Sequence, residues 1–345
     1  MMALMATLLF LLICSAMLTL PFVPAYREWK TPQDCAALPI SREYANEIDF
    51  FSNKFRDEAL SELAGNEAVS AGTFEYVCEP SDRMDWLAAT RPLIAQRTIF
   101  SEDGIRCNRP LYAAAAVECG RDSSFAALHT GGALRLCPYS EILEWAHADG
   151  AIDLDTACVA LRRLSSKSSI TLGPQCCFER IHAPVIRFGE LPEDISPPEQ
   201  LGCFPADFGL LSGAERRTPS LHLIQGDCTL PPGQIYTGSL VVTGRLIIGN
   251  NTTIIGDVKV REGIIVGCSV RVVGSLTCED RIYILDHAKI AGPVISETDI
   301  VIGSGAIMGD ADAPTTVSAE NIIAKSGAIS HGTLWARNVG VVWAP

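Results

Sequence analysis

The chain has 345 residues and a formal net charge of −13 at pH 7, so most of its surface is acidic and hydrated. This balance disfavours nucleic acid as a partner, because binding to phosphates requires a basic surface. Aromatic residues make up only 7% of the chain, while valine, isoleucine, alanine and glycine are frequent, which suits short strands and tight turns.

Residues 2–24 form an apolar run without a charged side chain, long enough to cross a bilayer as a helix. No basic residue precedes this run, which disfavours a signal peptide, although residues 23–25 resemble a small-residue cleavage site. Because Arg27, Lys30 and Arg42 all follow the run, the positive-inside rule predicts that the bulk of the chain is cytoplasmic. We expect a single-pass transmembrane anchor at 2–24, with cleavage after residue 25 as the alternative.

Residues 27–95 differ from the rest of the chain and are expected to form a mixed, partly helical juxtamembrane region. Apolar side chains recur at helical spacing between Ser41 and Leu63, which predicts an amphipathic helix. Ser41 suits its N-cap, and Gly65 suits the position after its end. We expect this helix to pack against the following domain, with a partner-binding surface as the alternative.

From about 98 to 189 the sequence repeats faintly with a period of eighteen residues. The segments LRLC (134–137), IDLD (152–155) and ITLG (170–173) begin eighteen residues apart, and IRFG (186–189) arrives two residues early. The range 98–189 is therefore expected to form irregular coils of a β-solenoid. The period is lost over 190–227, where proline and glycine concentrate, so this range is expected to be a loop or linker.

From 228 to 345 the same period is regular. The segments LIIG (246–249), IIVG (264–267), IYIL (282–285) and IVIG (300–303) begin eighteen residues apart. An extra four residues around 312–315 shift the phase, which resumes with NIIA at 321–324.

Each period divides into three rungs of six residues. Apolar residues recur in pairs two positions apart, such as Leu246 and Ile248, and this spacing places both on one face of a short strand. Such strands can bury their apolar faces only by stacking coil on coil. The predicted fold is mainly β: a β-solenoid with about 18 residues per coil, preceded by the transmembrane helix and a small helical segment. The pattern leaves open whether the two solenoid parts stack as one rod.

Cysteine is unusually frequent, with 13 residues scattered along the chain. Cys158, Cys176 and Cys278 fall where the repeat needs a small apolar residue. A free cysteine behaves as a small hydrophobic residue, so most of the cysteines are expected to be reduced and buried in the core.

The segment HGTLWARNVGVVWAP (331–345) carries hardly any charge. A solenoid ends in an open coil with unpaired backbone groups, so an apolar end without a cap favours assembly. We expect this end to mediate self-association through four residues: Trp335, Val341, Val342 and Trp343.

Two known families build eighteen-residue coils from hexads. Hexapeptide acyltransferases place a small residue two positions before the large aliphatic one, whereas Leu246 and Ile264 occupy that position here. From about 228 onward the chain resembles the bactofilins, on the segments GSLVVTGRLIIGNNTTIIGDVKVREGIIVG (238–267) and VIGSGAIMGD (301–310). Residues 145–189 also resemble the middle region of membrane-anchored members.

The resemblance implies a right-handed β-helix that assembles into non-polar filaments without nucleotide. It also implies a scaffold role at the bacterial inner membrane, where the polymer recruits other cell-envelope proteins. It supplies no catalytic residues and no cofactor.

Residues suited to catalysis or metal binding are few. An acyltransferase would need a general-base histidine in a cleft between coils, but the sequence places His182, His287 and His331 at exposed turns, and His129 and His147 likewise. The acidic turn at 310–312 does not recur from coil to coil, as a repeated Ca²⁺ site would. We therefore expect no catalytic, cofactor or metal site; a hexapeptide-type acyltransferase and an exported solenoid binding module are the alternatives.

Overall fold

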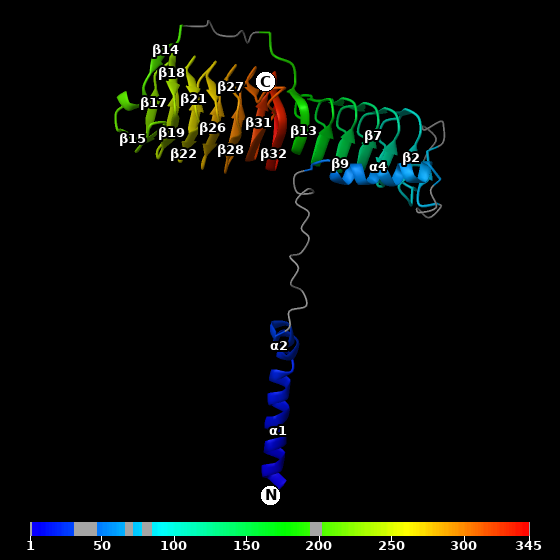
Figure 1. Cartoon of the computed structure of the whole chain (residues 1–345). Coiled ribbons are helices and arrows are strands. Elements are labelled where there is room, and N and C mark those ends of the chain that lie inside the picture. Colours follow the sequence, from blue (N-terminus) through cyan, green and yellow to red (C-terminus); the bar gives the residue numbers. More distant parts are fainter. Residues whose placement is uncertain (1, 31–46, 66–71, 78–84, 194–201, 345) are drawn as a thin grey trace. The chain divides into compact units, whose positions relative to one another are not determined.

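The computed structural model describes residues 2–30, 47–65, 72–77, 85–193 and 202–344. The chain divides into two compact units, residues 1–47 and 48–345. The first unit contains helices α1 (Met2–Thr19) and α2 (Phe22–Lys30), and the second contains helix α4 (Phe50–Leu63) and all the strands (Figure 1).

The expected transmembrane helix over 2–24 is not found. Helix α1 ends at Thr19, and α2 begins at Phe22. Pro21 accounts for the break, because proline disfavours the helical conformation of the residue before it. Among the described residues, no helix combines the length and the apolar character that a membrane crossing requires.

The amphipathic helix expected from Ser41 is shorter than predicted. The described part begins at residue 47, and α4 starts at Phe50, after a turn at Ile48 and Asp49. The expected N-cap at Ser41 lies outside the described residues. The stop at Gly65 is confirmed, since Gly65 adopts φ +67° directly after the helix end.

The second unit is a mainly β solenoid with about 18 residues per coil, as predicted, and it has about 14 turns. It consists of a first half, β1–β13, and a second half, β14–β32. The strands of the first half are β1 (Glu75–Tyr76), β2 (Leu93–Ala95), β3 (Ile99–Phe100), β4 (Arg106–Cys107), β5 (Leu111–Ala113), β6 (Val117–Cys119), β7 (Ser124–Thr130), β8 (Leu134–Leu136), β9 (Glu141–Ala148), β10 (Ile152–Leu154), β11 (Val159–Ser166), β12 (Ser169–Leu172) and β13 (Cys177–Phe188).

The second half has the more regular repeat. Its strands are β14 (Phe204–Ala206), β15 (Ala214–Thr218), β16 (Leu221–Ile224), β17 (Cys228–Leu230), β18 (Gln234–Thr237), β19 (Ser239–Val242), β20 (Leu246–Ile248), β21 (Thr253–Ile255), β22 (Val258–Val260), β23 (Ile264–Val266), β24 (Arg271–Val273), β25 (Leu276–Cys278), β26 (Ile282–Ile284), β27 (Lys289–Ile290), β28 (Val294–Ser296), β29 (Asp299–Ile302), β30 (Ile307–Met308), β31 (Thr315–Lys325) and β32 (Ala328–Trp343).

The predicted period is the pairing register of the coils. Leu246 pairs with Ile264, Ile264 with Ile282 and Ile282 with Ile300, always between parallel strands. The next step, from Ile300 to Ile322, is four residues longer, which confirms the predicted insertion. The side chains of each pair two apart are buried, as predicted, so every coil contributes large aliphatic residues to one continuous core.

Glycine closes one corner of the stacked coils. Gly256 and Gly274 have φ angles of +153° and +157°, values that side chains rarely tolerate. A Cβ atom on Gly256 would also overlap the carbonyl oxygen of Gly238 in the coil before. The eighteen-residue spacing of these glycines therefore reflects close contact between successive corners.

The cysteines follow the prediction. Cys158, Cys176 and Cys278 are buried, and the cysteines of the described residues are free thiols. The Cys176 thiol donates a hydrogen bond of 2.9 Å to the carbonyl oxygen of Asp155 in the coil before. These cysteines are part of the continuous hydrophobic core of the solenoid.

Two expected boundaries are wrong. Coils begin before residue 98, because Glu75 of β1 pairs with Leu93 of β2 eighteen residues later. They also extend into the expected linker 190–227, where β14 pairs with β18 and β16 with β19. A short 3₁₀ helix at Phe208–Leu210 and the β15–β16 hairpin interrupt the hexads there, and this hides the period.

The two halves meet through β13 and β32. These strands pair in antiparallel orientation, with Cys177 opposite Val341 and Phe188 opposite Ala328. The last coil of the first half thus stacks on the last coil of the second, while β14 lies at the far end of the second half (Figure 1). The halves form one continuous rod whose chain direction reverses at this junction, the β13–β32 junction.

Candidate functional site: a buried histidine row beneath helix α4

One outward-facing row of side chains crosses the first half and reaches the β13–β32 junction. Its members occupy matching positions on neighbouring strands, and we call them the histidine row: Tyr112, His129, His147, Ser165, His182 and Thr333. Helix α4 lies over the strands that carry the first members (Figure 1). Outward-facing side chains of a solenoid normally meet water, so burial of this row requires a covering element.

The exposed turns predicted for four histidines are wrong. His129 and His147 lie in β7 and β9 and are 0% and 1% exposed. Their strands are longer than a hexad allows, and α4 covers them. His182 lies in β13, and His331 lies in β32, where its Nδ1 is 2.9 Å from the carbonyl oxygen of Pro184.

Only His287 is at a turn, as predicted. Its φ of +59° places it at the corner of a coil, between β26 and β27. Its side chain is half-buried rather than exposed.

Apolar side chains fasten α4 to the solenoid. Phe55 packs against Phe74 and Trp145, with ring centroids 5.9 and 5.7 Å apart. Ala59 is 0% exposed and belongs to the same cluster, which also includes Ile94. The helix therefore docks through a small hydrophobic core of its own, separate from the solenoid interior.

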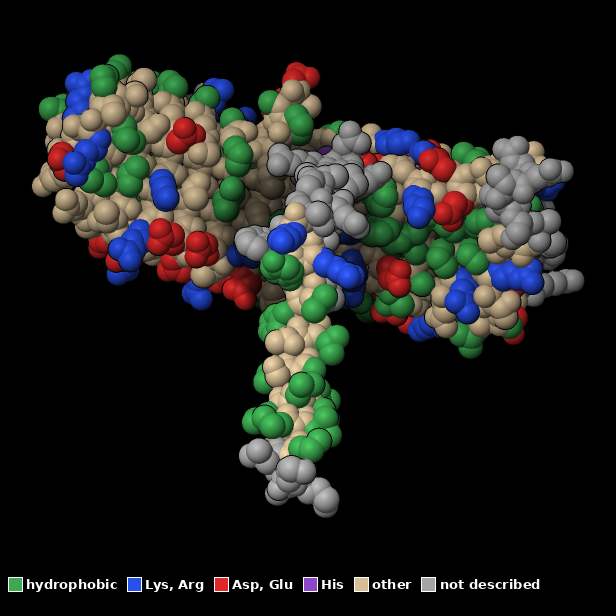
Figure 2. Space-filling model, turned by 60° about the horizontal axis from the view of Figure 1, so that its bottom comes forward, with side chains coloured by type: hydrophobic (Ala, Val, Ile, Leu, Met, Phe, Trp, Pro, Cys, Tyr) green, Lys and Arg blue, Asp and Glu red, His purple; other side chains and the backbone are tan. Residues whose placement is uncertain are grey.

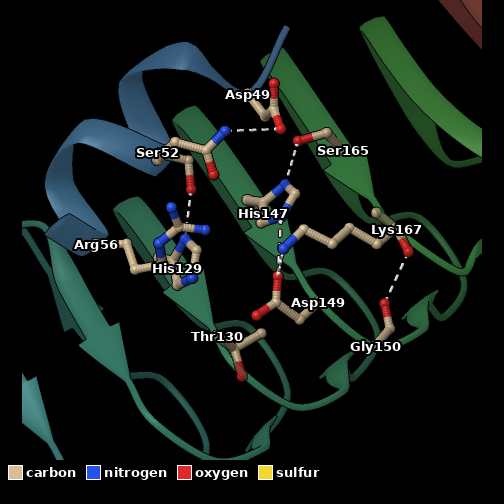
Figure 3. Close-up of polar contacts among 12 residues, drawn as sticks. Asp49, Ser52, Arg56, His129, Thr130, His147, Asp149, Gly150, Ser165 and Lys167 are labelled. Carbon is tan, nitrogen blue, oxygen red and sulfur yellow. Dashed lines mark hydrogen bonds and ion pairs between the residues drawn. The ribbon is translucent and has the colours of Figure 1, made fainter. Parts of the chain in front are cut away.

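Hydrogen bonds link the row to α4 and along its length. Ser52 of α4 is hydrogen-bonded through Oγ to Nδ1 of His129 at 2.7 Å, and His147 Nδ1 is hydrogen-bonded to Ser165 Oγ at 2.7 Å (Figure 3). At the junction, His182 Nδ1 is 2.9 Å from Thr333 Oγ1. These bonds fix the ring orientations and satisfy one nitrogen of each imidazole.

The aromatic rings of the row stack on one another. The rings of Tyr112 and His129 are 5.4 Å apart, and those of His129 and His147 are 5.2 Å apart, nearly parallel in both cases. Such stacking suits neutral imidazoles, because two positive rings at this distance would repel one another.

Burial keeps both histidines neutral near pH 7. It lowers the pKa of His129 to about 4, and the neighbouring His147 acts in the same direction. Burial likewise lowers the pKa of His147, against the opposing influence of Asp49 and Asp149. The Nε2 atoms of both rings are buried and have no hydrogen-bond partner among the described residues.

Asp149 and Lys167 lie at the edge of the row. Lys167 Nζ is 2.6 Å from Asp149 Oδ1, and His147 Nε2 is 3.4 Å from the same oxygen (Figure 3). Burial favours the protonated carboxyl, but the hydrogen bond and charge of Lys167 outweigh it and hold the pKa of Asp149 below its usual range. The carboxylate is thus committed mainly to Lys167.

Ser165, His147 and Asp149 have the residue types of a hydrolytic triad. Ser165 is only 3% exposed and His147 1%, however, so a substrate carbonyl could not reach the serine hydroxyl while α4 is docked. The 3.4 Å contact to Asp149 is also longer than a good hydrogen bond. The arrangement orients side chains beneath a helix and offers no open catalytic site.

The expected self-association residues lie at the β13–β32 junction. Val341 is opposite Cys177, and Trp335 is opposite Arg180, with the guanidinium 5.4 Å from the Trp335 ring centroid. Val342 is buried in the core, and Trp343 is 57% exposed. The premise of an open C-terminal coil is therefore wrong, because β13 of the same chain occupies its edge.

No metal centre emerges from the described residues, where no group of three or more His, Cys, Asp or Glu side chains is placed to hold an ion. The acidic turn at Asp310 closes on itself through hydrogen bonds between Asp310 and Ala313.

The sequence contained a signal for the histidine row. His129, His147 and Ser165 are eighteen residues apart, in phase with the coils. The period predicts that they share a face, but it cannot show that α4 covers that face.

Three comparisons with known proteins found no match. No protein-family model matches the sequence, no curated protein matches it, and no solved structure matches it. The fold therefore defines the class: a β-solenoid of about 14 turns, preceded by two short helices.

Proposed function

We propose that this chain is a non-catalytic scaffold of the bactofilin type, a right-handed β-helical rod that self-associates end to end. In this proposal the N-terminal apolar segment holds the rod at the cytoplasmic face of a bacterial inner membrane, where the assembled rods recruit other envelope proteins.

The β13–β32 junction carries this proposal. Two coil ends of the same kind stack there through a run of backbone pairs from Cys177–Val341 to Phe188–Ala328. Open coil ends in this sequence can therefore be completed by another coil end in antiparallel orientation. The two outer ends of the rod are the starting coils of the first and the second half. If each end pairs with the same end of another chain, the resulting filament has no polarity.

The outer end of the second half supports such contacts. The 3₁₀ segment there is anchored by Phe208, which stacks on Tyr236 with ring centroids 4.6 Å apart. Beside it, Phe204 and Leu210 are 68% and 87% exposed. Large apolar side chains at the end of a rod favour association, because contact removes their surface from water.

Membrane attachment is supported by α1. Figure 2 shows hydrophobic side chains on the visible sides of this helix. Its exposed large apolar residues include Leu8, Leu9, Phe10, Leu11 and Leu12. Basic residues follow in α2, at Arg27 and Lys30. An apolar segment next to basic residues suits an anionic membrane surface.

Electron microscopy and sedimentation of the full chain in detergent test the self-association. We expect end-to-end oligomers that grow with concentration, and strictly monomeric particles at high concentration would contradict the proposal. Leu210→Asp should weaken assembly, whereas Ile265→Asp, a matched change on an exposed side chain of a middle coil, should not.

A further inference from the structure

A pair of arginines lies on the outer face of the solenoid, one row away from the histidine row. Arg163 of β11 and Arg180 of β13 occupy matching positions on neighbouring parallel strands. Their row continues to Trp145 on one side and to Trp335, across the β13–β32 junction, on the other. Neighbouring strands are about 4.8 Å apart, so the two side chains start close together on one face.

Aromatic rings hold both guanidinium groups. The Arg163 guanidinium lies 4.9 Å from the ring centroid of Phe51 on α4, and that of Arg180 lies 5.4 Å from the centroid of Trp335. A guanidinium uses its faces for such stacking and its edges for hydrogen bonds. The stacking itself therefore does not use the hydrogen-bonding edges of either group.

The pair lacks a carboxylate. Neither arginine forms an ion pair with an acidic side chain of the described residues, although the chain is strongly acidic overall. Arg180 is half-buried, and its Nε is buried without a hydrogen-bond partner in the described part of the chain. Burial and the neighbouring Arg163 charge both lower the pKa of Arg180.

We propose that Arg163 and Arg180 bind a phosphate-type oxyanion, either as free phosphate or as the head group of a phospholipid. Two adjacent positive charges match the charge of a phosphate monoester, which is close to −2, better than the single charge of a carboxylate. Its several oxygens can accept hydrogen bonds from the Nη groups of both guanidinium groups at once.

Calorimetric titration of the full chain in detergent with inorganic phosphate tests the site, with chloride at equal ionic strength as the reference. We expect Arg163→Gln and Arg180→Gln each to weaken phosphate binding by about tenfold to a hundredfold, as expected for charge-assisted hydrogen bonds. Arg162→Gln, which removes an exposed arginine of the same strand, should leave binding unchanged.

A second arm separates the two sources of phosphate. Vesicles of phosphatidylcholine with and without phosphatidic acid are tested for binding that inorganic phosphate competes away. A lipid head group is supported if the chain binds the phosphatidic acid vesicles, inorganic phosphate competes with this binding, and Arg163→Gln and Arg180→Gln abolish it. A free anion is supported if the chain binds inorganic phosphate but does not bind these vesicles in a way that phosphate competes with.

Should a glutamine variant unfold, Arg163→Lys and Arg180→Lys keep the charge but lose the planar fork, and they should still weaken phosphate binding. Absence of phosphate binding, or binding that is equal in the parent chain and these variants, would overturn the proposal. The outcome is independent of whether the rods self-associate.

Discussion

A designed cross-link can test the β13–β32 junction directly. Val341 lies opposite Cys177, and both side chains are half-buried on the same face of the paired strands. Opposite Cβ atoms in antiparallel strands are about 4.5–5.5 Å apart and a disulfide needs roughly 3.5–4.5 Å, so a small adjustment is sufficient. We expect Val341→Cys to form a disulfide with Cys177 on mild oxidation.

The position of the cross-link sets the size of its effect. It would close a loop of roughly 165 residues, for which the loss of unfolded-state entropy corresponds to about 5 kcal/mol at 25 °C. Engineered disulfides usually deliver less, so an increase of about 2–4 kcal/mol in the free energy of unfolding is expected. The increase should disappear when a reductant is added.

Peptide mapping by mass spectrometry, together with guanidinium unfolding with and without reductant, measures both results. Val341→Ser controls for the lost valine, and Cys177→Ser in the Val341→Cys background should remove the cross-link. A disulfide found only between different chains would refute the junction as an intramolecular contact. Failure of the introduced cysteine to react with Cys177 at all would refute the register.

Three further predictions concern α4 and the coil corners. Phe55→Ala should cost about 3–5 kcal/mol of α4 docking, seen as faster hydrogen exchange over residues 50–63. His129 has a pKa of about 4 in the folded state, below its unfolded value near 6.5. Its contribution to the free energy of unfolding is therefore fully present above pH 6.5, and about 3 kcal/mol of it is lost as the pH falls towards 4. His129→Gln should flatten this dependence when the free energy of unfolding is measured as a function of pH. Gly256→Ala should lower the free energy of unfolding by about 2 kcal/mol or more, because both φ and the space oppose a side chain; Gly202→Ala, in open space, should have little effect.

The coils could be predicted because each rung carries its own signal. Pairs such as Leu246 and Ile248 repeat at every coil, and the pairing register of Ile264 with Ile282 is the sequence period itself. The signal fails where a hairpin replaces the hexads, as at β15 and β16, so the start of the second half was not recognised.

The junction and the histidine row depend on contacts that no period encodes. β13 and β32 are about 150 residues apart and pair in antiparallel orientation, and the repeat gives no information about which coil ends will meet. His129 and His147 were expected at exposed turns, whereas they lie on the outward face of β7 and β9. Their burial depends on α4, whose docking residues Phe55 and Ala59 follow helical spacing rather than the coil period.

The reversal of chain direction at the junction has a consequence for biosynthesis. β13 is complete once residue 188 has left the ribosome, but its partner strand comprises residues 328–343. At about 5–20 residues per second, the edge of β13 waits on the order of ten seconds for that partner. The second half meanwhile grows from its far end towards the waiting edge. During this interval the nascent chain exposes an unpaired sheet edge. Pairing with another chain made on the same messenger RNA is therefore most favoured during synthesis.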